Sequence, residues 1–157
     1  MLVDGISIKS IETNNTYEVK IIDQTLLPHK LEFIPLKNFN DCCKAIREMW
    51  VRGAPLIGVT ASYGMFFAIK ENSSEENINF AFKKLLATRP TAVDLKWALE
   101  SILILLKDVN INDKADLVWE FSRKLESDSI LQCSKIGDYG LEIIESSFKN
   151  NTTINIL

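Results

Sequence analysis

The chain has 157 residues, a formal net charge of −3 at pH 7 and a hydrophobic fraction of 46%, which suits one domain with a substantial core. The acidic balance and the lack of a lysine- or arginine-rich block argue against nucleic acid or an anionic membrane surface as the main partner. We expect a cytoplasmic protein, because no apolar run reaches transmembrane length and the N-terminus lacks a signal-peptide pattern.

The first part of the sequence alternates between apolar and polar residues with a period of two, which is typical of half-buried strands. Strands are predicted at residues 6–8, 17–21 and 31–33. Asn14 and Asn15 tolerate a left-handed backbone and suit a hairpin turn. The sequence therefore predicts a small antiparallel sheet over residues 1–35.

The apolar period becomes helical after Pro35. Asn38 is a predicted N-cap, and Ser73 with Glu76 forms a predicted capping box for a later helix. Gly137 and Gly140 fall inside the last helix, where we expect tight packing to explain them, because glycine is a poor helix former. The predicted helices span residues 39–50, 55–70, 74–86, 91–107, 113–125 and 128–148.

The run V-R-G-A-P-L-I-G at residues 51–58 sets an arginine on a glycine turn just before a helix. Pro55 suits the first helical position, because its φ is fixed and it has no N–H, and Ala54 is then the predicted N-cap. First-turn N–H groups and the helix dipole would face an anion above Gly53, with Arg52 as a further donor. The alternative is that Gly53 only ends the preceding helix while Arg52 lies in solvent.

A second segment, residues 89–99, again places an arginine and a proline before a predicted helix. Thr91 and Asp94 approximate a capping box, and Asp94 lies favourably in the positive first turn. Arg89 would then help to hold an anion at a second helix start. The alternative is a surface ion pair between Arg89 and a carboxylate, worth under about 1 kcal/mol.

The cysteines and the single histidine give no metal-binding or disulfide pattern. Cys42, Cys43 and Cys133 are odd in number and lack a Cys-x-x-Cys spacing, and His29 is the one imidazole. Cys42 and Cys43 fall on the apolar side of a predicted helix, where free cysteine acts as a small hydrophobe. We therefore expect no metal site and no catalytic cysteine among them.

Three segments in this order resemble the signatures of the methylthioribose-1-phosphate isomerases, within the initiation factor two-B alpha/beta/delta-like superfamily. They are D-Q-T-L-L-P-H at residues 23–29, the R-G-A-P run and residues 89–99. The expected fold is α+β: an antiparallel sheet subdomain at residues 1–35, then a helical substrate-binding subdomain at 36–150. Residues 151–157 resemble the start of a truncated Rossmann-like catalytic domain.

The family resemblance implies an aldose–ketose isomerisation of 5-methylthioribose 1-phosphate to 5-methylthioribulose 1-phosphate in methionine salvage, without a cofactor. It implies that Arg52, Gly53, Ala54 and Arg89 bind the sugar phosphate. The family's catalytic cysteine and aspartate would lie beyond Leu157, so we expect no catalytic residue in this chain and no activity from it alone. The intact protein is expected to be a homodimer.

Two other functions stay open at this point. One is a non-enzymatic regulatory scaffold related to initiation factor two-B subunits, although a scaffold has no physical need for both arginine segments. The other is a ribose 1,5-bisphosphate isomerase, which needs a cationic pocket where a methylthio group needs an apolar one. Asp94 stands where the family has asparagine, and Lys96 where it often has an aromatic or apolar residue.

Overall fold

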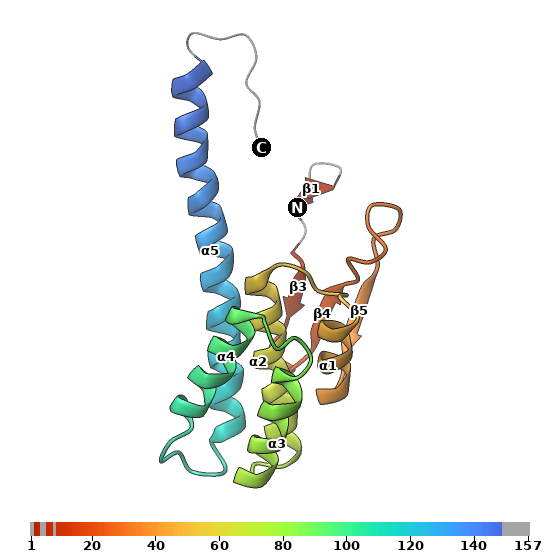
Figure 1. Cartoon of the computed structure of the whole chain (residues 1–157), viewed down its shortest axis with the longest axis vertical. Helices are drawn as coiled ribbons and strands as arrows, with labels where there is room; N and C mark the ends of the chain where they lie inside the picture. The colour runs from red at the N-terminus through yellow and green to blue at the C-terminus, as the bar shows by residue number, and fades with distance from the viewer. Residues whose placement is uncertain (1, 4–5, 8, 149–157) are drawn as a thin grey trace.

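The computed structural model describes residues 2–3, 6–7 and 9–148. A small sheet is followed by five helices, so the predicted α+β class is confirmed (Figure 1). The elements are β1 (Leu2–Val3), β2 (Ile6–Ser7), β3 (Ile11–Thr13), β4 (Val19–Ile22), β5 (Phe33–Leu36), α1 (Phe39–Arg47), α2 (Ala54–Glu71), α3 (Glu75–Leu86), α4 (Val93–Leu105) and α5 (Lys114–Phe148). The strand expected near residues 152–157 lies outside the described residues, and the division into subdomains stays a prediction.

The main sheet is antiparallel, in the order β3-β4-β5, and Ile21 of β4 pairs with Ile11 on one side and Ile34 on the other. The predicted hairpin turn is confirmed, because the Asn14 side chain accepts backbone N–H bonds from Thr16 and Glu18 at 2.9 and 3.1 Å. The strand before this turn is β3, whereas the predicted strand at residues 6–8 contributes β2, which pairs with β1.

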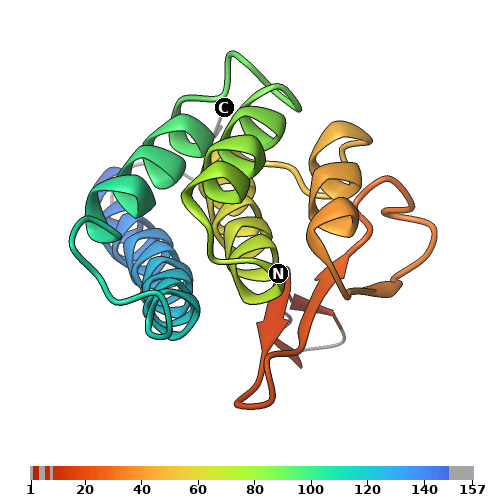
Figure 2. The ribbon, with the colours of Figure 1, turned by 90° about the horizontal axis from the view of Figure 1, so that it is seen from below.

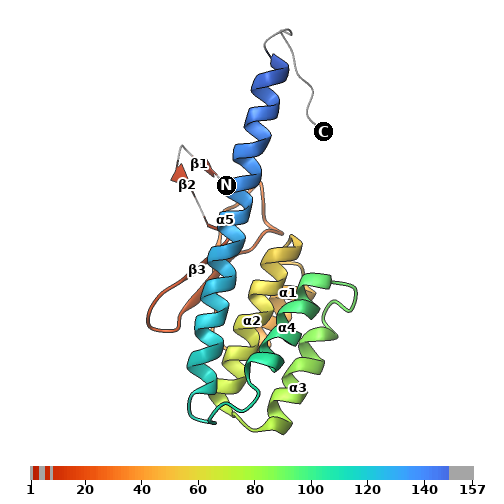
Figure 3. The ribbon, with the colours of Figure 1, turned by 90° about the vertical axis from the view of Figure 1, so that its left-hand side faces the viewer.

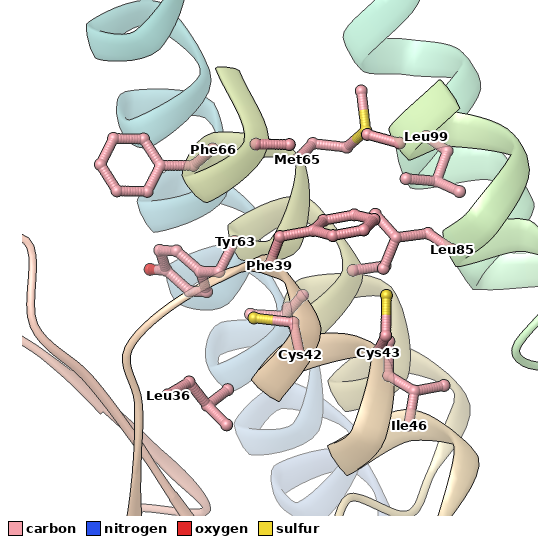
Figure 4. Close-up of a cluster of buried hydrophobic side chains, with 14 of the residues drawn as sticks. Leu36, Phe39, Cys42, Cys43, Ile46, Tyr63, Met65, Phe66, Leu85 and Leu99 are labelled. Carbon is pink, nitrogen blue, oxygen red and sulfur yellow. The ribbon is translucent and has the colours of Figure 1, made fainter. Parts of the chain in front are cut away.

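Helix α2 lies at the centre of the helical part and contacts α1, α3, α4 and α5. Seen from below in Figure 2, α4 and α5 lie on one side of α2 and α1 lies on the other. Every α2 residue from Ile57 to Phe66 is buried, which explains why its sequence lacks a polar face. Figure 4 shows Tyr63, Met65 and Phe66 of α2 in the core that it shares with its neighbours.

Small residues let other helices approach α2 closely. A Cβ on Gly64 would lie 3.1 Å from side-chain atoms of both Cys42 and Leu85. Cys42 and Cys43 are buried in this core, so their predicted role as small hydrophobes is confirmed. Burial raises the pKa of both thiols, which keeps them in the protonated form.

Helix α5 is one continuous helix of 35 residues, so the prediction of two helices, at residues 113–125 and 128–148, was wrong. Ser127 and Asp128 are exposed and do not interrupt it, because polar residues are tolerated on a solvent-facing helix surface. Its first half packs on α2, and its second half extends past the bundle (Figures 1 and 3). No helix among the described residues has the length and apolar character needed to cross a membrane.

The outer half of α5 lacks the packing that the sequence led us to expect. Every residue from Leu131 to Tyr139 is exposed. A Cβ added at Gly137 or Gly140 would meet nothing within 4 Å among the described residues. The expectation that these glycines mark tight packing is therefore wrong for the described part of the chain.

Candidate functional site

The loop that carries Arg52 is fixed from two sides. The backbone N–H of Trp50 donates to the carbonyl of Ala45, near the end of α1, at 2.9 Å. The carbonyl of Trp50 in turn accepts a bond from the backbone N–H of Gln24, also at 2.9 Å. Gln24 belongs to the D-Q-T-L-L-P-H segment. Within that segment the buried side chain of Asp23 accepts hydrogen bonds from the backbone N–H and the hydroxyl of Thr25. The first signature segment therefore supports the backbone just before the second one.

Helix α2 begins at Ala54, and its N-cap is Gly53, with φ +90° and ψ 131°. The prediction that Ala54 is the N-cap was wrong, because the helix begins at Ala54, one residue earlier than expected. The non-helical N-cap position falls at Gly53, whose positive φ is easy for glycine and unfavourable for alanine. Pro55 lies in the first turn, and no side chain caps this helix start. Arg52, Gly53 and Ala54 are all exposed.

Helix α4 begins at Val93 after Ala92, again without a side-chain cap. The predicted Thr91–Asp94 capping box was wrong, because the helix starts two residues after Thr91 and a capping side chain must come from the residue directly before the helix. Asp94 does lie in the first turn, as predicted. Arg89 is half-buried in the preceding turn, and its carbonyl oxygen accepts a bond from the N–H of Ala92 at 3.0 Å.

The two other helices of the first four do have side-chain caps. Asn38 caps α1, as predicted, by accepting a bond from the N–H of Asp41 at 3.0 Å. Ser74 caps α3 through the N–H of Asn77, so the predicted cap at Ser73 was wrong. The Ser73 hydroxyl instead donates to the carbonyl of Ile69, because α2 still reaches Glu71 and leaves its last carbonyls to be satisfied. Uncapped starts thus occur at α2 and α4, which follow the two arginine segments.

Neither arginine has a neutralising partner among the residues that the structure describes. Within the described parts of the chain, Arg52 and Arg89 form no ion pair and no side-chain hydrogen bond. The alternative in which Arg89 pairs with a surface carboxylate is therefore not observed. Lys96 lies on the exposed side of α4, with its ammonium 3.7 Å from the carboxylate of Glu100.

The starts of α2 and α4 lie side by side at the same end of the bundle (Figures 1 and 3). A Cβ on Gly58 would lie 3.0 Å from the backbone oxygen of Asp94, so the two helices are in backbone contact there. A cleft of about 250 Å³ lies beside this contact, lined by Pro55, Gly58, Asp94 and Trp97 together with residues of α5. Asp128 of α5 also lines it, which makes this side of the site acidic.

A larger cleft of about 390 Å³ lies next to Arg52, between the start of α2, the residues leading into β3, and α5. Arg52 and Gly53 line one part of it, and Glu126, Ile130 and Cys133 line the α5 side. Arg89 is not among the residues that line either cleft. The structure therefore places Arg52 and Gly53 at a cavity, with Arg89 in the turn before the neighbouring helix.

Glu126 is a cleft residue that the sequence analysis missed. Its side chain is buried, and its Oε2 atom accepts hydrogen bonds from the hydroxyls of Tyr63 at 2.8 Å and Thr13 at 3.2 Å. Burial, together with the Glu126 charge, raises the pKa of Tyr63, so its hydroxyl remains a donor. The signal in the sequence was Ser122 and Glu126, two polar residues four apart on the buried stripe of α5 that includes Val118.

The part of the chain that the structure describes holds no cluster of metal-binding side chains. Within the described ranges, no three histidine, cysteine, aspartate or glutamate side chains gather as a metal site. The features of this end of the bundle are instead those of anion binding: free helix N-termini, an exposed glycine and unpaired guanidinium groups.

The sequence matches known proteins over most of its length. A methylthioribose-1-phosphate isomerase from Paramagnetospirillum magneticum is 41% identical over 140 residues, and one from Escherichia coli is 37% identical over 142. Each alignment covers 88% of this chain, but only 39% and 38% of the two relatives. The chain thus spans about two fifths of the length of these curated relatives.

Two solved structures share the fold. The 5-methylthioribose 1-phosphate isomerase of Pyrococcus horikoshii has a TM-score of 0.66 at 30% identity, covering 74% of this chain and 35% of that one. The translation initiation factor eIF-2B subunit delta of A. fulgidus has a TM-score of 0.77 at 33% identity, covering 87% and 42%. A sequence profile of the Initiation factor 2 subunit family matches residues 50–155. With two thirds of its residues in that match, the chain belongs to the Initiation factor 2 subunit family.

Proposed function

We propose that this chain is the N-terminal, substrate-binding part of an aldose–ketose isomerase that converts 5-methylthioribose 1-phosphate to 5-methylthioribulose 1-phosphate in methionine salvage. The observation that carries the proposal is the pair of uncapped helix starts, α2 and α4, side by side and each preceded by an unpaired arginine. The names of the relatives support the choice of substrate.

The phosphate group is assigned to the start of α2. The N–H groups there have no side-chain acceptor, and the positive end of the helix dipole stabilises an anion. Gly53 and Ala54 present this backbone, and apart from its chain neighbours no described residue lies within 4 Å of the Cβ position of Gly53. Arg52 adds a guanidinium with paired donors that match phosphate oxygens, and Arg89 adds charge from the adjacent helix start.

The acid–base chemistry is assigned to the part of the protein that corresponds to the remaining length of the relatives. Moving hydrogen between neighbouring sugar carbons needs a positioned acid and base. Cys42 and Cys43 are buried in the core of this chain, away from the proposed phosphate site, and are unsuited to that role. We propose that the intact protein acts in the cytoplasm as a homodimer, and without a metal or organic cofactor.

Calorimetric titration of this chain with 5-methylthioribose 1-phosphate tests the proposal. We expect Arg52→Ala and Arg89→Ala each to weaken binding by about 1.5–3 kcal/mol, the usual worth of a hydrogen bond to a charged group. Arg47→Ala is the matched control, because Arg47 is also an exposed arginine but lies at the end of α1, outside both clefts. Equal affinities for wild type and for both site variants would contradict the assignment.

A regulatory, non-enzymatic subunit is the second candidate function, favoured by the structural similarity to eIF-2B subunit delta. The same titration separates the two. A scaffold would bind 5-methylthioribose 1-phosphate no more tightly than inorganic phosphate, whereas the isomerase part would prefer the sugar phosphate. Tighter binding of ribose 1,5-bisphosphate than of the methylthio sugar would instead indicate a bisphosphate isomerase.

A further inference from the structure

The cleft next to Arg52 contains a buried carboxylate, Glu126, that forms no ion pair within the described chain, although Lys9 and Arg123 line the same surroundings. Glu126 is 8% exposed and forms no ion pair with any residue that the structure describes. Its two bonded partners, Tyr63 and Thr13, are uncharged hydroxyls. Burying a carboxylate outside a direct ion pair is costly, and groups of this kind concentrate where a protein acts on a ligand.

One oxygen of this carboxylate is free to meet a ligand. Both hydrogen bonds, from Tyr63 and from Thr13, go to Oε2 of Glu126. No buried side-chain oxygen or nitrogen in the described chain lacks a partner, so the unbonded Oε1 is not sealed in the core. Glu126 lines the cleft that Arg52 and Gly53 also line, and it lines a neighbouring cleft with Arg123, so its carboxylate lies at the boundary between the two.

The carboxylate is also held in a fixed orientation. Tyr63 is fully buried on α2, and its hydroxyl points away from Leu85 and Leu99 (Figure 4). Thr13, at the end of β3, holds the same oxygen from the sheet side. A side chain fixed in this way loses little further freedom on binding, which favours a specific contact over an adaptable one.

We propose that Glu126 binds the ring hydroxyls of a sugar phosphate whose phosphate lies at Gly53. An ionised carboxylate only accepts hydrogen bonds, so it recognises hydroxyl donors and repels phosphate. Arg52 and Glu126 then divide the cleft into a phosphate-binding end and a hydroxyl-binding end. Its volume of about 390 Å³ suits a small ligand. This inference rests on the proposed function and assigns a binding residue to the sugar hydroxyls, which Arg52 does not contact.

The test compares two phosphate esters of the same ring size, ribose 1-phosphate and cyclopentyl phosphate, which lacks hydroxyls. We expect wild type to prefer ribose 1-phosphate by about tenfold. In Glu126→Gln this preference should fall to within twofold, while the affinity for cyclopentyl phosphate stays the same or rises. Glu120→Gln is the matched control, because it makes the same change at an exposed position of α5 outside the cleft.

The outcomes separate this inference from the proposed function. One outcome is that cyclopentyl phosphate binds only when Arg52 is present and that wild type does not prefer ribose 1-phosphate. This outcome overturns the role of Glu126, while the proposed phosphate site stands. A preference that survives in Glu126→Gln does the same. If neither ester binds, both proposals fall. Should Glu126→Gln not fold, the carboxyl ¹³C resonance of Glu126 in wild type decides: it must move with ribose 1-phosphate and not with cyclopentyl phosphate.

Discussion

Gly58 and Asp94 join the two proposed anion-binding segments, because a Cβ on Gly58 would lie 3.0 Å from the backbone oxygen of Asp94. Real Cβ atoms are rarely found so close to a backbone oxygen, and neither helix can bend easily out of the way. The absence of a side chain at Gly58 therefore sets how closely the start of α4 approaches α2. It also sets the position of Arg89 relative to Arg52.

We expect Gly58→Ala to destabilise the protein, although alanine is the better helix former. Overpacking costs about 1–3 kcal/mol, and the better helix propensity of alanine returns about 1 kcal/mol, so the free energy of unfolding should fall by up to about 2 kcal/mol. Urea denaturation measures this. Gly137→Ala is the control: its Cβ meets no neighbour within 4 Å, so stability should rise. Equal changes in both variants would refute the steric argument.

Ala92→Ser should stabilise the protein and leave phosphate binding at the start of α2 unchanged. Ala92 is the uncapped N-cap of α4 with an extended backbone, and a serine there would gain about 1 kcal/mol by bonding a first-turn N–H. Because the phosphate is assigned to the start of α2, the new bond at α4 does not compete with it, and the Kd should stay within about twofold. Thermal denaturation and phosphate titration give the two readings. A Kd that rises well beyond this in the more stable variant would place the anion at the start of α4 instead.

Much of the secondary structure could be predicted because it depends on short-range patterns. The Asn14 turn and the Asn38 cap are bonds within four residues, and the apolar stripes of the helices repeat every three or four. Helix starts were harder, since the side chains of neighbours such as Ser73 and Ser74 are equally able to cap. The false break near residue 127 arose because local polarity does not show whether a helix continues.

The site was predictable only in part. Arg52 and Arg89 stand out beside glycine and proline, and the family resemblance orders them along the chain. The contact between α2 and α4 joins Gly58 and Asp94, which are 36 positions apart in the sequence. The hydrogen bond from Tyr63 to Glu126 joins residues 63 positions apart. No local pattern contains such a distance, because it depends on how complete helices pack.

Stability should decrease at alkaline pH through Tyr63. Burial, and then the charge of Glu126, raises the pKa of this phenol above its ordinary value of 10.0. The native state therefore binds the proton more tightly than the unfolded chain, so the contribution is complete below pH 10 and is lost as the pH rises beyond it. Urea denaturation at a series of pH values measures this decrease.

Tyr63→Phe provides the control for that prediction. At neutral pH the variant should lose about 1–3 kcal/mol, because Glu126 keeps one donor instead of two. Above pH 10 its stability should fall less steeply than that of wild type. Burial also raises the pKa of Cys42, so the loss of stability that Cys42 causes at alkaline pH remains in both proteins. Parallel pH profiles would show that Tyr63 does not titrate with unfolding.

The outer half of α5 should drive self-association of this chain. Ile136, Tyr139 and Ile143 lie three and four residues apart on one face and are each more than 60% exposed. Sedimentation velocity should show concentration-dependent oligomers that Ile136→Glu together with Ile143→Glu dissolves. Ile111→Glu, at an exposed position before α5, should leave them intact. A monomeric wild type at high concentration would exclude this role.

Because α5 is continuous, two parts of the same helix differ in what stabilises them. Near Trp119 it is held by the aromatic core, where the Trp119 ring centroid lies 4.8 Å from that of Phe66. From Leu131 to Tyr139 every residue is exposed, so within the described chain the helix depends there mainly on its own backbone bonds, which Gly137 weakens. Heating should therefore fray α5 from its carboxyl end, before the aromatic core opens. Melting will not be a single cooperative step, so far-ultraviolet and near-ultraviolet circular dichroism will report different midpoints.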